Sequence, residues 1–317
     1  MAQTLMLVEK SDHQISWYNV ETGALVGRRV RLPDFPHEFV VDAQNRYGYV
    51  GHYGVKSSAD EGTNGRSVIV IDVAAQKILH TYDTGKHARP HGVGLDQLGR
   101  LYALSELTAH ILVKNDPQAF DQGWDHITST GGEKSHLFAL SKDGQTCYSL
   151  NLDSGDVTVF NPHDASVEPI SIETGDKPEG SHLTEDENTL YVANRGSGTI
   201  AVVDTKSKSV LRTFKAAPDC CRIYHESKRN RLLTINYLDQ SFSVFDEAKG
   251  NEIHRLALPA RALAMNVDPD EKFAYVAVDC GQVHRVDLES FQVVQIIETG
   301  QEPDVMHILP DGFYTNA

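Results

Sequence analysis

The sequence predicts an all-β protein, a seven-bladed β-propeller built from four-stranded blades. Three observations predict it: a strand-turn-strand unit, the regular recurrence of that unit, and incomplete units at both ends of the chain. The unit is seen in residues 177–204, KPEGSHLTEDENTLYVANRGSGTIAVVD, where short apolar runs alternate with turns. A unit this small cannot bury its own faces, so we expect it to be one copy of a repeat.

The unit recurs along the whole chain. LYVANRGSGTIAVVD has counterparts in LYALSELTAHILVK, CYSLNLDSGDVTVFN, LLTINYLDQSFSVFD and AYVAVDCGQVHRVD, and the copy YGYVGHYG…RSVIVIDV contains a long insertion at about residues 52–66. A fourth strand such as SVLRTFKA follows each copy. The first strands of the units start 41 to 54 residues apart. Seven units at this period predict a propeller, whereas a β-sandwich would not explain the maintained period.

The two ends of the chain complete one blade. The N-terminal segment LMLVEKSDHQISWYNVETGALVGRRVRL supplies the second, third and fourth strands of a unit, and the C-terminal segment DVMHILPDGFYTNA supplies a first strand. We therefore expect the ring to be closed by a blade built from both termini, which leaves no exposed sheet edge. Residues 1–317 then form a single propeller domain.

Composition limits the possible functions. The formal charge of −15 argues against a nucleic-acid-binding surface, because phosphate contacts need clustered Lys and Arg. No apolar run approaches the roughly 20 residues of a membrane span, and MAQTLMLVEKSDHQ does not resemble a secretory signal. Four cysteines are too few for a disulfide framework in a chain of 317 residues. We expect a reduced, cytoplasmic protein, and the sequence does not indicate its oligomeric state.

The repeat resembles a known group of proteins. LYVANRGSGTIAVVD is similar to the YVTN repeat of the YncE-like and surface-layer propellers, within the wider lactonase-like superfamily. That superfamily includes 6-phosphogluconolactonase and the fungal type of carboxymuconate cycloisomerase. The resemblance covers essentially the whole chain and implies the blade architecture, but its members include both enzymes and non-catalytic binding proteins. The chain lacks the PRH…HP spacing of the lactonases.

The heads of the inner strands are the first place to look for a site, because they converge around the mouth of the central channel. The residues aligned there are His37, His91, His136, Glu179, Arg222, Leu263 and Asp304. Three imidazoles and a carboxylate can hold Zn, Mn, Fe or Ni and leave a position open for water or substrate. The pattern predicts a divalent metal held by His37, His91, His136 and Asp304. Histidines that only hydrogen-bond loop carbonyls would give the same pattern.

Arg222 and Glu179 are expected to act on the substrate. A guanidinium at the mouth suits a carboxylate or phosphate in a bidentate clamp, and Glu179 would supply a catalytic carboxylate. A structural pair between the two residues is the alternative. Cys220 and Cys221 stand beside Arg222. A thiolate nucleophile is one interpretation of these cysteines, and small buried side chains the other.

A second tier follows three residues further along the inner strands. It contains His182, His225, Asn266 and His307, about 10 Å deeper in the channel. We expect His182, His225 and His307 to serve as catalytic acid–base groups, or as the metal site if the register slips. Burial between blades, with backbone hydrogen-bond partners, is the alternative.

The connections between second and third strands open on the same face. They bring His52, Glu106, Asn151 and Asn194 toward the mouth. We expect His52 and Glu106 to bind substrate and the two asparagines to cap turns with their side chains. Arg261 would bind substrate if it replaced Leu263 at the mouth. The polar, Gly-rich insertion after His52 is either a lid over the channel or an ordinary variable loop.

These features predict a metal-dependent enzyme of the lactonase, lyase or isomerase type. Each of these reactions needs a polarised carbonyl and a base, and the substrate would be a small hydroxylated or carboxylated molecule at the channel mouth. The alternative is a non-catalytic propeller that binds a small molecule or a protein partner. That alternative predicts aromatic and apolar residues at the mouth rather than imidazoles and carboxylates.

Overall fold

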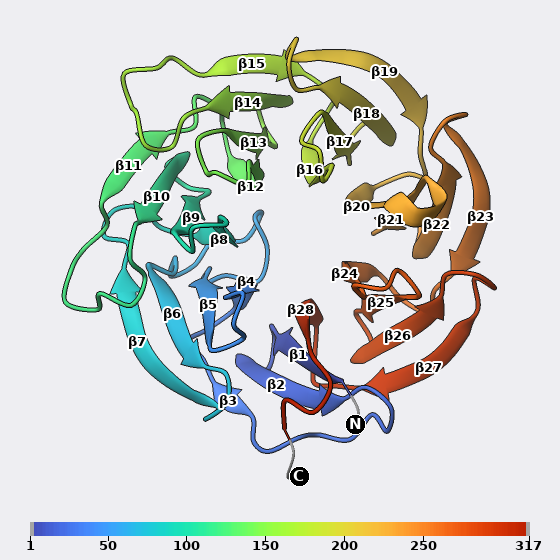
Figure 1. The fold of residues 1–317 in the computed structure, drawn as a ribbon, viewed down its shortest axis with the longest axis horizontal. Helices are drawn as coiled ribbons and strands as arrows, with labels where there is room; N and C mark the ends of the chain where they lie inside the picture. Colours follow the sequence, from blue (N-terminus) through green and yellow to red (C-terminus); the bar gives the residue numbers. More distant parts are fainter. Residues whose placement is uncertain (1–2, 315–317) are drawn as a thin grey trace.

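The structure, a computed structural model, describes residues 3–314, so residues 1–2 and 315–317 of the predicted domain lie outside it. The described residues form seven four-stranded antiparallel sheets in a ring (Figure 1). The sheets are blades 1 to 6, made of β4–β7, β8–β11, β12–β15, β16–β19, β20–β23 and β24–β27, and blade 7, made of β28, β1, β2 and β3. The predicted seven-bladed propeller is confirmed.

Each blade contributes one strand to each of four concentric layers. The first, innermost strands are β4 (Pro36–Val41), β8 (Pro90–Leu95), β12 (Ser135–Leu140), β16 (Pro178–Leu183), β20 (Cys220–Glu226), β24 (Ala262–Val267) and β28 (Pro303–Leu309). The second strands are β5 (Tyr47–His52), β9 (Leu101–Ser105), β13 (Cys147–Asn151), β17 (Thr189–Asn194), β21 (Arg231–Asn236), β25 (Phe273–Val278) and β1 (Thr4–Glu9).

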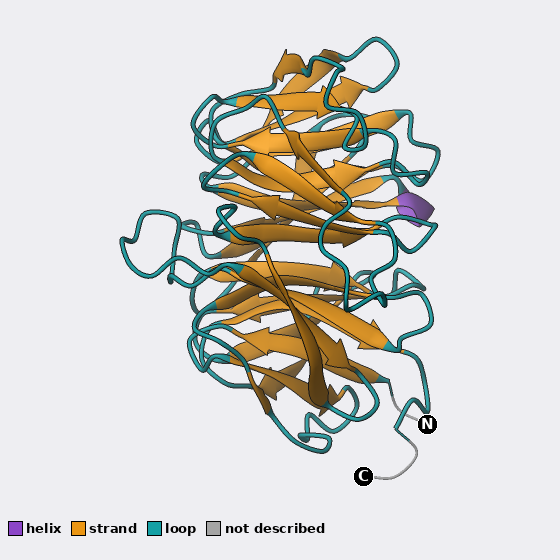
Figure 2. Ribbon diagram, turned by 90° about the vertical axis from the view of Figure 1, so that its left-hand side faces the viewer, coloured by secondary structure: helices purple, strands orange, loops and turns teal. Residues whose placement is uncertain are grey.

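The two outer layers follow the same order. The third strands are β6 (Ser67–Asp72), β10 (His110–Lys114), β14 (Asp156–Phe160), β18 (Thr199–Asp204), β22 (Ser241–Asp246), β26 (Gln282–Asp287) and β2 (Gln14–Asn19). The fourth are β7 (Lys77–Asp83), β11 (His126–Ser129), β15 (Ile170–Glu173), β19 (Ser209–Lys215), β23 (Asn251–Ala257), β27 (Val293–Glu298) and β3 (Val30–Arg31). A short 3-10 turn, η1 (Ser227–Arg229), follows β20 and marks the face opposite the mouth (purple in Figure 2).

The burial of each strand explains its sequence pattern. The middle strands pack against neighbouring blades on both faces, so β17 and β18 carry continuous apolar runs with buried residues. The outermost strands have one face in water and alternate, as β19 does by exposing Leu211. β28 pairs with β1, with Met6 opposite His307, which confirms that the termini share a blade. No helix in residues 3–314 is long and apolar enough to cross a membrane.

A bulge near the start of each first strand positions the site. In blade 4, Pro178 pairs with Asn194 and Gly180 with Ala193, which leaves Glu179 unpaired between them. The residue before this strand, Lys177, has a positive φ of 51°. The same register shift occurs at the start of the first strand in all six other blades. A bulge redirects the side chain of the extra residue, and here it points that side chain into the channel mouth.

Candidate functional site

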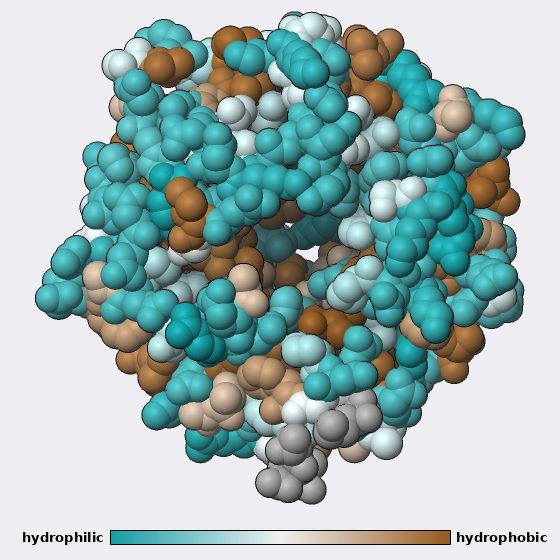
Figure 3. Space-filling model, viewed as in Figure 1, coloured by the Kyte–Doolittle hydropathy of each residue, from teal (hydrophilic) through white to brown (hydrophobic). Residues whose placement is uncertain are grey.

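A cavity of about 280 Å³ occupies the channel mouth. The lining residues on the first strands come from all seven blades: His37, His91, His136, Glu179, Cys221, Arg222, Leu263 and Asp304. All seven positions that the sequence alignment placed at the mouth therefore lie together. Figure 3 shows the opposite face of the ring, on which η1 lies, with a central opening bordered by both hydrophilic and hydrophobic residues.

The structure corrects the predicted register in blade 5. Cys220 pairs with Asn236 and Arg222 with Ile235, so Cys221 occupies the bulge position that Glu179 occupies in blade 4. Arg222 is one residue further along, and its long side chain still reaches the cavity. Burial raises the pKa of the Cys220 thiol to about 12 and that of Cys221 further. Both cysteines are therefore buried thiols and not thiolate nucleophiles.

Blade 6 contributes Leu263 to the mouth, as aligned. Arg261 does not line the cavity; its side chain is 41% exposed and pairs with Asp279. The substrate-binding role that Arg261 would have had in place of Leu263 has no support from its position.

The three mouth histidines form a stack. The ring centroids of His37 and His91 are 4.6 Å apart, and those of His91 and His136 are 3.7 Å apart with a tilt of 35°. Two imidazoles bound to one metal at about 2.1 Å hold their centroids about 4.5 Å or more apart. His91 and His136 are thus arranged as stacked rings and do not converge on a common ion. Among the described residues, no group of three or more His, Cys, Asp or Glu side chains has the geometry of a metal site. The divalent metal stays a prediction, and we assign no chemical step to it.

The stacked histidines His37 and His91 are neutral near pH 7. Burial, together with the neighbouring positive groups, lowers the pKa of both well below the usual value. His37 Nδ1 lies 3.3 Å from Asp304 Oδ2 without the geometry of a hydrogen bond. Both nitrogens of His37 and the Nδ1 of His91 are buried without a hydrogen-bond partner in residues 3–314. Buried polar atoms of this kind need a partner, which a polar ligand in the cavity would supply.

His136 differs from the other two because a buried carboxylate holds it. Its Nδ1 lies 2.5 Å from Glu106 Oε2, and the hydroxyl of Tyr53 donates to Glu106 Oε1 at 2.6 Å. Burial alone would raise the pKa of Glu106, but the hydrogen bonds from His136 and Tyr53 outweigh it and lower the pKa. An ionised Glu106 accepts a proton-bearing Nδ1, which leaves the lone pair on Nε2. Glu106 is 3% exposed and does not line the cavity, so it positions His136 rather than binding substrate.

Arg222 is fixed by two carboxylates from different blades. It lies 2.8 Å from Glu38 in β4 and 3.4 Å from Glu179 in β16. Glu179 in turn accepts a hydrogen bond of 2.7 Å from Arg195, which also pairs with Asp219. Burial opposes ionisation of Glu179, yet Arg195 and Arg222 lower its pKa. The predicted Arg222–Glu179 pair exists as one part of an alternating chain of charges.

Sequence reasoning missed Glu38, which directly follows His37. Its side chain is 13% exposed, and burial raises its pKa to about 7 against the opposing effect of Arg222. The signal in the sequence was a carboxylate inside PHEFVV, an otherwise apolar inner strand.

The second ring of mouth residues was placed one position too early in three blades. The true set directly follows the second strands and lines the cavity with Lys10, Tyr53, Leu152, Arg195 and Tyr237. The residues one position earlier are structural, which is the role expected for Asn151 and Asn194 but not for His52. His52 contacts Ser67, and Asn151 and Asn194 hydrogen-bond inside their own blades. In the structure Pro36 pairs with His52, which makes His52 the last strand residue and Tyr53 the first residue beyond it.

The three histidines predicted deeper in the channel, His182, His225 and His307, lie in different environments. His182 lines a separate cavity of about 480 Å³ below Arg222 and lies against Tyr224. His225 packs on Tyr191, and His307 lies 3.0 Å from Asn45. None of the three lines the mouth cavity, so the structure does not bring them together with Glu179 and Arg222 as one catalytic group.

The insertion after His52 reaches the mouth. Lys56, Ser57, Ser58 and Ala59 from it line the cavity, and Lys56 lies 3.4 Å from Glu302. Arg89 anchors it with hydrogen bonds to Asn64 Oδ1 at 2.6 Å and to the carbonyl of Asp60 at 2.7 Å. The insertion therefore forms one wall of the site.

Comparisons with known proteins agree on the fold. No family model matches the sequence, and no curated protein matches it. A periplasmic gluconolactonase from Pseudomonas aeruginosa superposes with a TM-score of 0.78 at 17% identity over 98% of this chain and 99% of that one. A putative 6-phosphogluconolactonase from Bacteroides uniformis gives 0.76 at 15% identity, covering 98% and 100%. A protein of unknown function from Desulfotomaculum acetoxidans gives 0.77 at 13% identity, also covering 98% and 100%. At 13 to 17% identity these likenesses show a shared propeller fold, and the resemblance in the sequence is confirmed at the level of the fold alone.

Proposed function

We propose that this protein is a hydrolase that opens a small, hydroxylated, anionic lactone at the channel mouth. The observation that carries the proposal is His136, whose Nδ1 is held by buried Glu106 while its ring lines a cavity that also contains Arg222. A carboxylate that fixes the tautomer of a histidine is the arrangement of a general base. Lyase and isomerase chemistry would use the same base and are separated by product analysis.

The chemistry follows from the groups present. Nε2 of His136 takes a proton from water, and the resulting hydroxide attacks the lactone carbonyl. Arg222 lies beside the cavity and would stabilise the oxyanion, because a fixed cation in a dry site strongly favours developing negative charge. Collapse of the intermediate breaks the ring C–O bond. The protonated His136 then returns its proton to the leaving alkoxide, so that lactone and water give one hydroxy acid.

The charges at the mouth support an anionic substrate. Four cationic side chains, Lys10, Lys56, Arg195 and Arg222, line the cavity together with two carboxylates, Glu179 and Asp304. This count holds for the cavity surface only, because Lys56 also pairs with Glu302, Arg195 with Asp219 and Arg222 with Glu38 outside it. The local field at a cleft, not the net charge, selects the ligand. The unpartnered nitrogens of His37 and His91 add hydrogen-bonding positions for hydroxyl groups.

The test is hydrolysis of sugar-acid lactones at neutral pH, corrected for spontaneous opening. The superposed gluconolactonase makes aldonolactones the first panel. We expect turnover by the wild type and a loss of about 10²-fold or more in kcat in His136→Ala. His254→Ala on the outer strand β23, where the ring stacks on Phe291, is the matched control. Binding without turnover by the wild type, or equal rates in His136→Ala, would overturn the hydrolase and favour a binding protein.

A further inference from the structure

A larger groove continues outward from the mouth cavity. It has a volume of about 890 Å³, roughly three times that of the mouth, and shares Ser58, Ala59, Leu152, Glu179 and Arg195 with it. The two hollows therefore adjoin each other. The mechanism above uses the inner part only.

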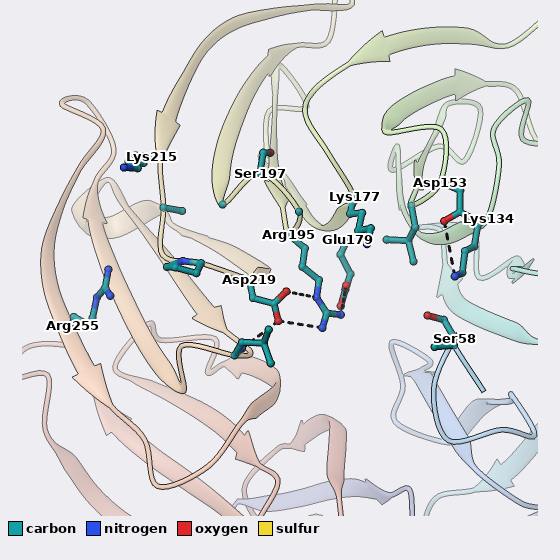
Figure 4. A pocket seen from close by; sticks show the side chains of 17 residues that line it. Ser58, Lys134, Asp153, Lys177, Glu179, Arg195, Ser197, Lys215, Asp219 and Arg255 are labelled. Carbon is teal, nitrogen blue, oxygen red and sulfur yellow. Dashed lines mark hydrogen bonds and ion pairs between the residues drawn. The ribbon is translucent and has the colours of Figure 1, made fainter. Parts of the chain in front are cut away.

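The floor of the groove is made of small residues. The hairpin between β17 and β18 contributes Gly196, Ser197 and Gly198, and the segment before β20 contributes Ala216 and Pro218. A Cβ atom at Gly196 would lie 2.1 Å from a carboxylate oxygen of Asp176, so this position accepts no side chain without movement. The short hairpin keeps the groove open, and the insertion with Ser58 faces it from the other side (Figure 4).

The walls carry a series of cations: Lys134, Lys177, Arg195, Lys215 and Arg255. Figure 4 shows them spread across the groove, with Lys134 on one side, Lys177 and Arg195 in the middle, and Lys215 and Arg255 on the other side. The three acids of the lining are already paired, Glu179 and Asp219 with Arg195 and Asp153 with Lys134. Arg255 is itself paired with Glu252 and Asp239 outside the groove. Lys177 and Lys215 are exposed and have no carboxylate within 4 Å in the part of the chain described.

Lys177 and Lys215, the lining cations without a carboxylate partner among the described residues, lie apart from each other, and this separation indicates the kind of ligand (Figure 4). One phosphate would need cations that converge, whereas cations in a row match a chain with an anion on each unit. No aromatic side chain of the described residues lines the groove, which disfavours stacked nucleobases. Under the proposed function, on which this step rests, the inner cavity takes a sugar-acid lactone, so a chain that continues from it is a sugar chain. We propose that the groove binds a short acidic oligosaccharide, a chain of uronate units, whose terminal unit enters the mouth.

Binding by calorimetry tests this with uronate monomer and trimer, using trigalacturonate as the chain. We expect the wild type to bind trimer about tenfold or more tightly than monomer. Lys177→Glu/Lys215→Glu should lose that difference while monomer binding is unchanged. Glutamate is tolerated at the positive φ of Lys177, because Glu302 has the same conformation in blade 7. Lys206→Glu/Lys208→Glu, at the exposed turn between β18 and β19, is the control of equal charge change.

Four results would contradict the proposed oligosaccharide site. They are equal affinity for trimer and monomer, equal affinity for trigalacturonate and neutral maltotriose, an equal loss of the trimer preference in the control variant, or tighter binding of an acidic peptide of the same charge. The experiment needs no turnover. A trimer preference that depends on Lys177 and Lys215, in a protein that does not hydrolyse lactones, would contradict the proposed hydrolase and support the oligosaccharide site. Lactone hydrolysis without a trimer preference would support the hydrolase and contradict the oligosaccharide site.

Discussion

The guanidinium of Arg222 lies 2.8 Å from the carboxylate of Glu38, although 184 residues separate them in the sequence. Glu38 is in blade 1 and Arg222 in blade 5, so the contact crosses the channel beneath the mouth cavity. Both occupy the position that follows the bulge residue of their blade. The pair forms a polar floor that separates the mouth cavity from the hollow lined by His182.

The raised pKa of Glu38 makes stability depend on pH. Burial raises this pKa from 4.5 to about 7, and Asp304 and Glu179 oppose its ionisation while Arg222 favours it. Between these two pH values the folded state binds more protons than the unfolded state, so unfolding free energy falls as pH rises from about 5 to 7. We expect wild type to lose up to about 3 kcal/mol relative to Glu38→Gln across that window.

Urea denaturation at pH 5, 6, 7 and 8 measures this effect. Glu289→Gln, an exposed carboxylate in the connection between β26 and β27, is the control and should follow the wild type at every pH. A Glu38→Gln difference that stays constant with pH would contradict a raised pKa of Glu38 in the folded protein.

The fold could be predicted from the sequence because a repeat shows its strands several times over. The bulges could not be predicted, since one extra residue changes neither the period nor the hydrophobic pattern. That is why Arg222 was aligned where Cys221 lies. For the same reason His52 was predicted at the mouth, where Tyr53 lies instead.

The hydrogen-bond partners of the site residues could not be predicted from the sequence either. Glu106 was predicted at the mouth, but its hydrogen bond to His136 joins blades 2 and 3 and has no signature in the sequence. Three histidines in register are equally compatible with a metal and with a stack. Ring orientation decides between these two, and only the structure shows it.

Glu106→Gln should impair catalysis without impairing binding. An amide can no longer enforce the proton on Nδ1 of His136, so we expect kcat for lactone hydrolysis to fall about 10²-fold or more with KM nearly unchanged. Tyr53→Phe removes a single hydrogen bond to Glu106 and should cost about 0.5–1.5 kcal/mol in the barrier, a several-fold loss. Equal losses in both variants, or a loss confined to KM, would show that Glu106 does not act through His136.

Arg89→Ala should release the insertion that walls the site. Arg89 holds Asn64 and the carbonyls of Ser58 and Asp60, and each charged hydrogen bond contributes about 1.5–3 kcal/mol. We expect faster limited proteolysis within residues 53–66 and a raised KM. Arg89 also lies 3.8 Å from Glu106, so Asn64→Ala, which removes a loop contact alone, is the matched variant. Cleavage at the wild-type rate in both variants would mean that the insertion is held by other contacts.

Chelation should leave lactone hydrolysis and ligand binding intact. His91 and His136 are stacked at 3.7 Å, and Nδ1 of His136 is engaged by Glu106, so the rings as they lie do not offer converging donors to an ion. Elemental analysis of untagged wild type and His37→Ala/His91→Ala measures whether the protein contains a metal. EDTA treatment followed by the hydrolysis assay measures whether activity depends on a metal. Near-stoichiometric metal that disappears in the double variant, together with activity lost on chelation and restored by Zn, Mn, Fe or Ni, would contradict the stack. The rings would then have to rotate on binding an ion, and His136 would change from general base to ligand.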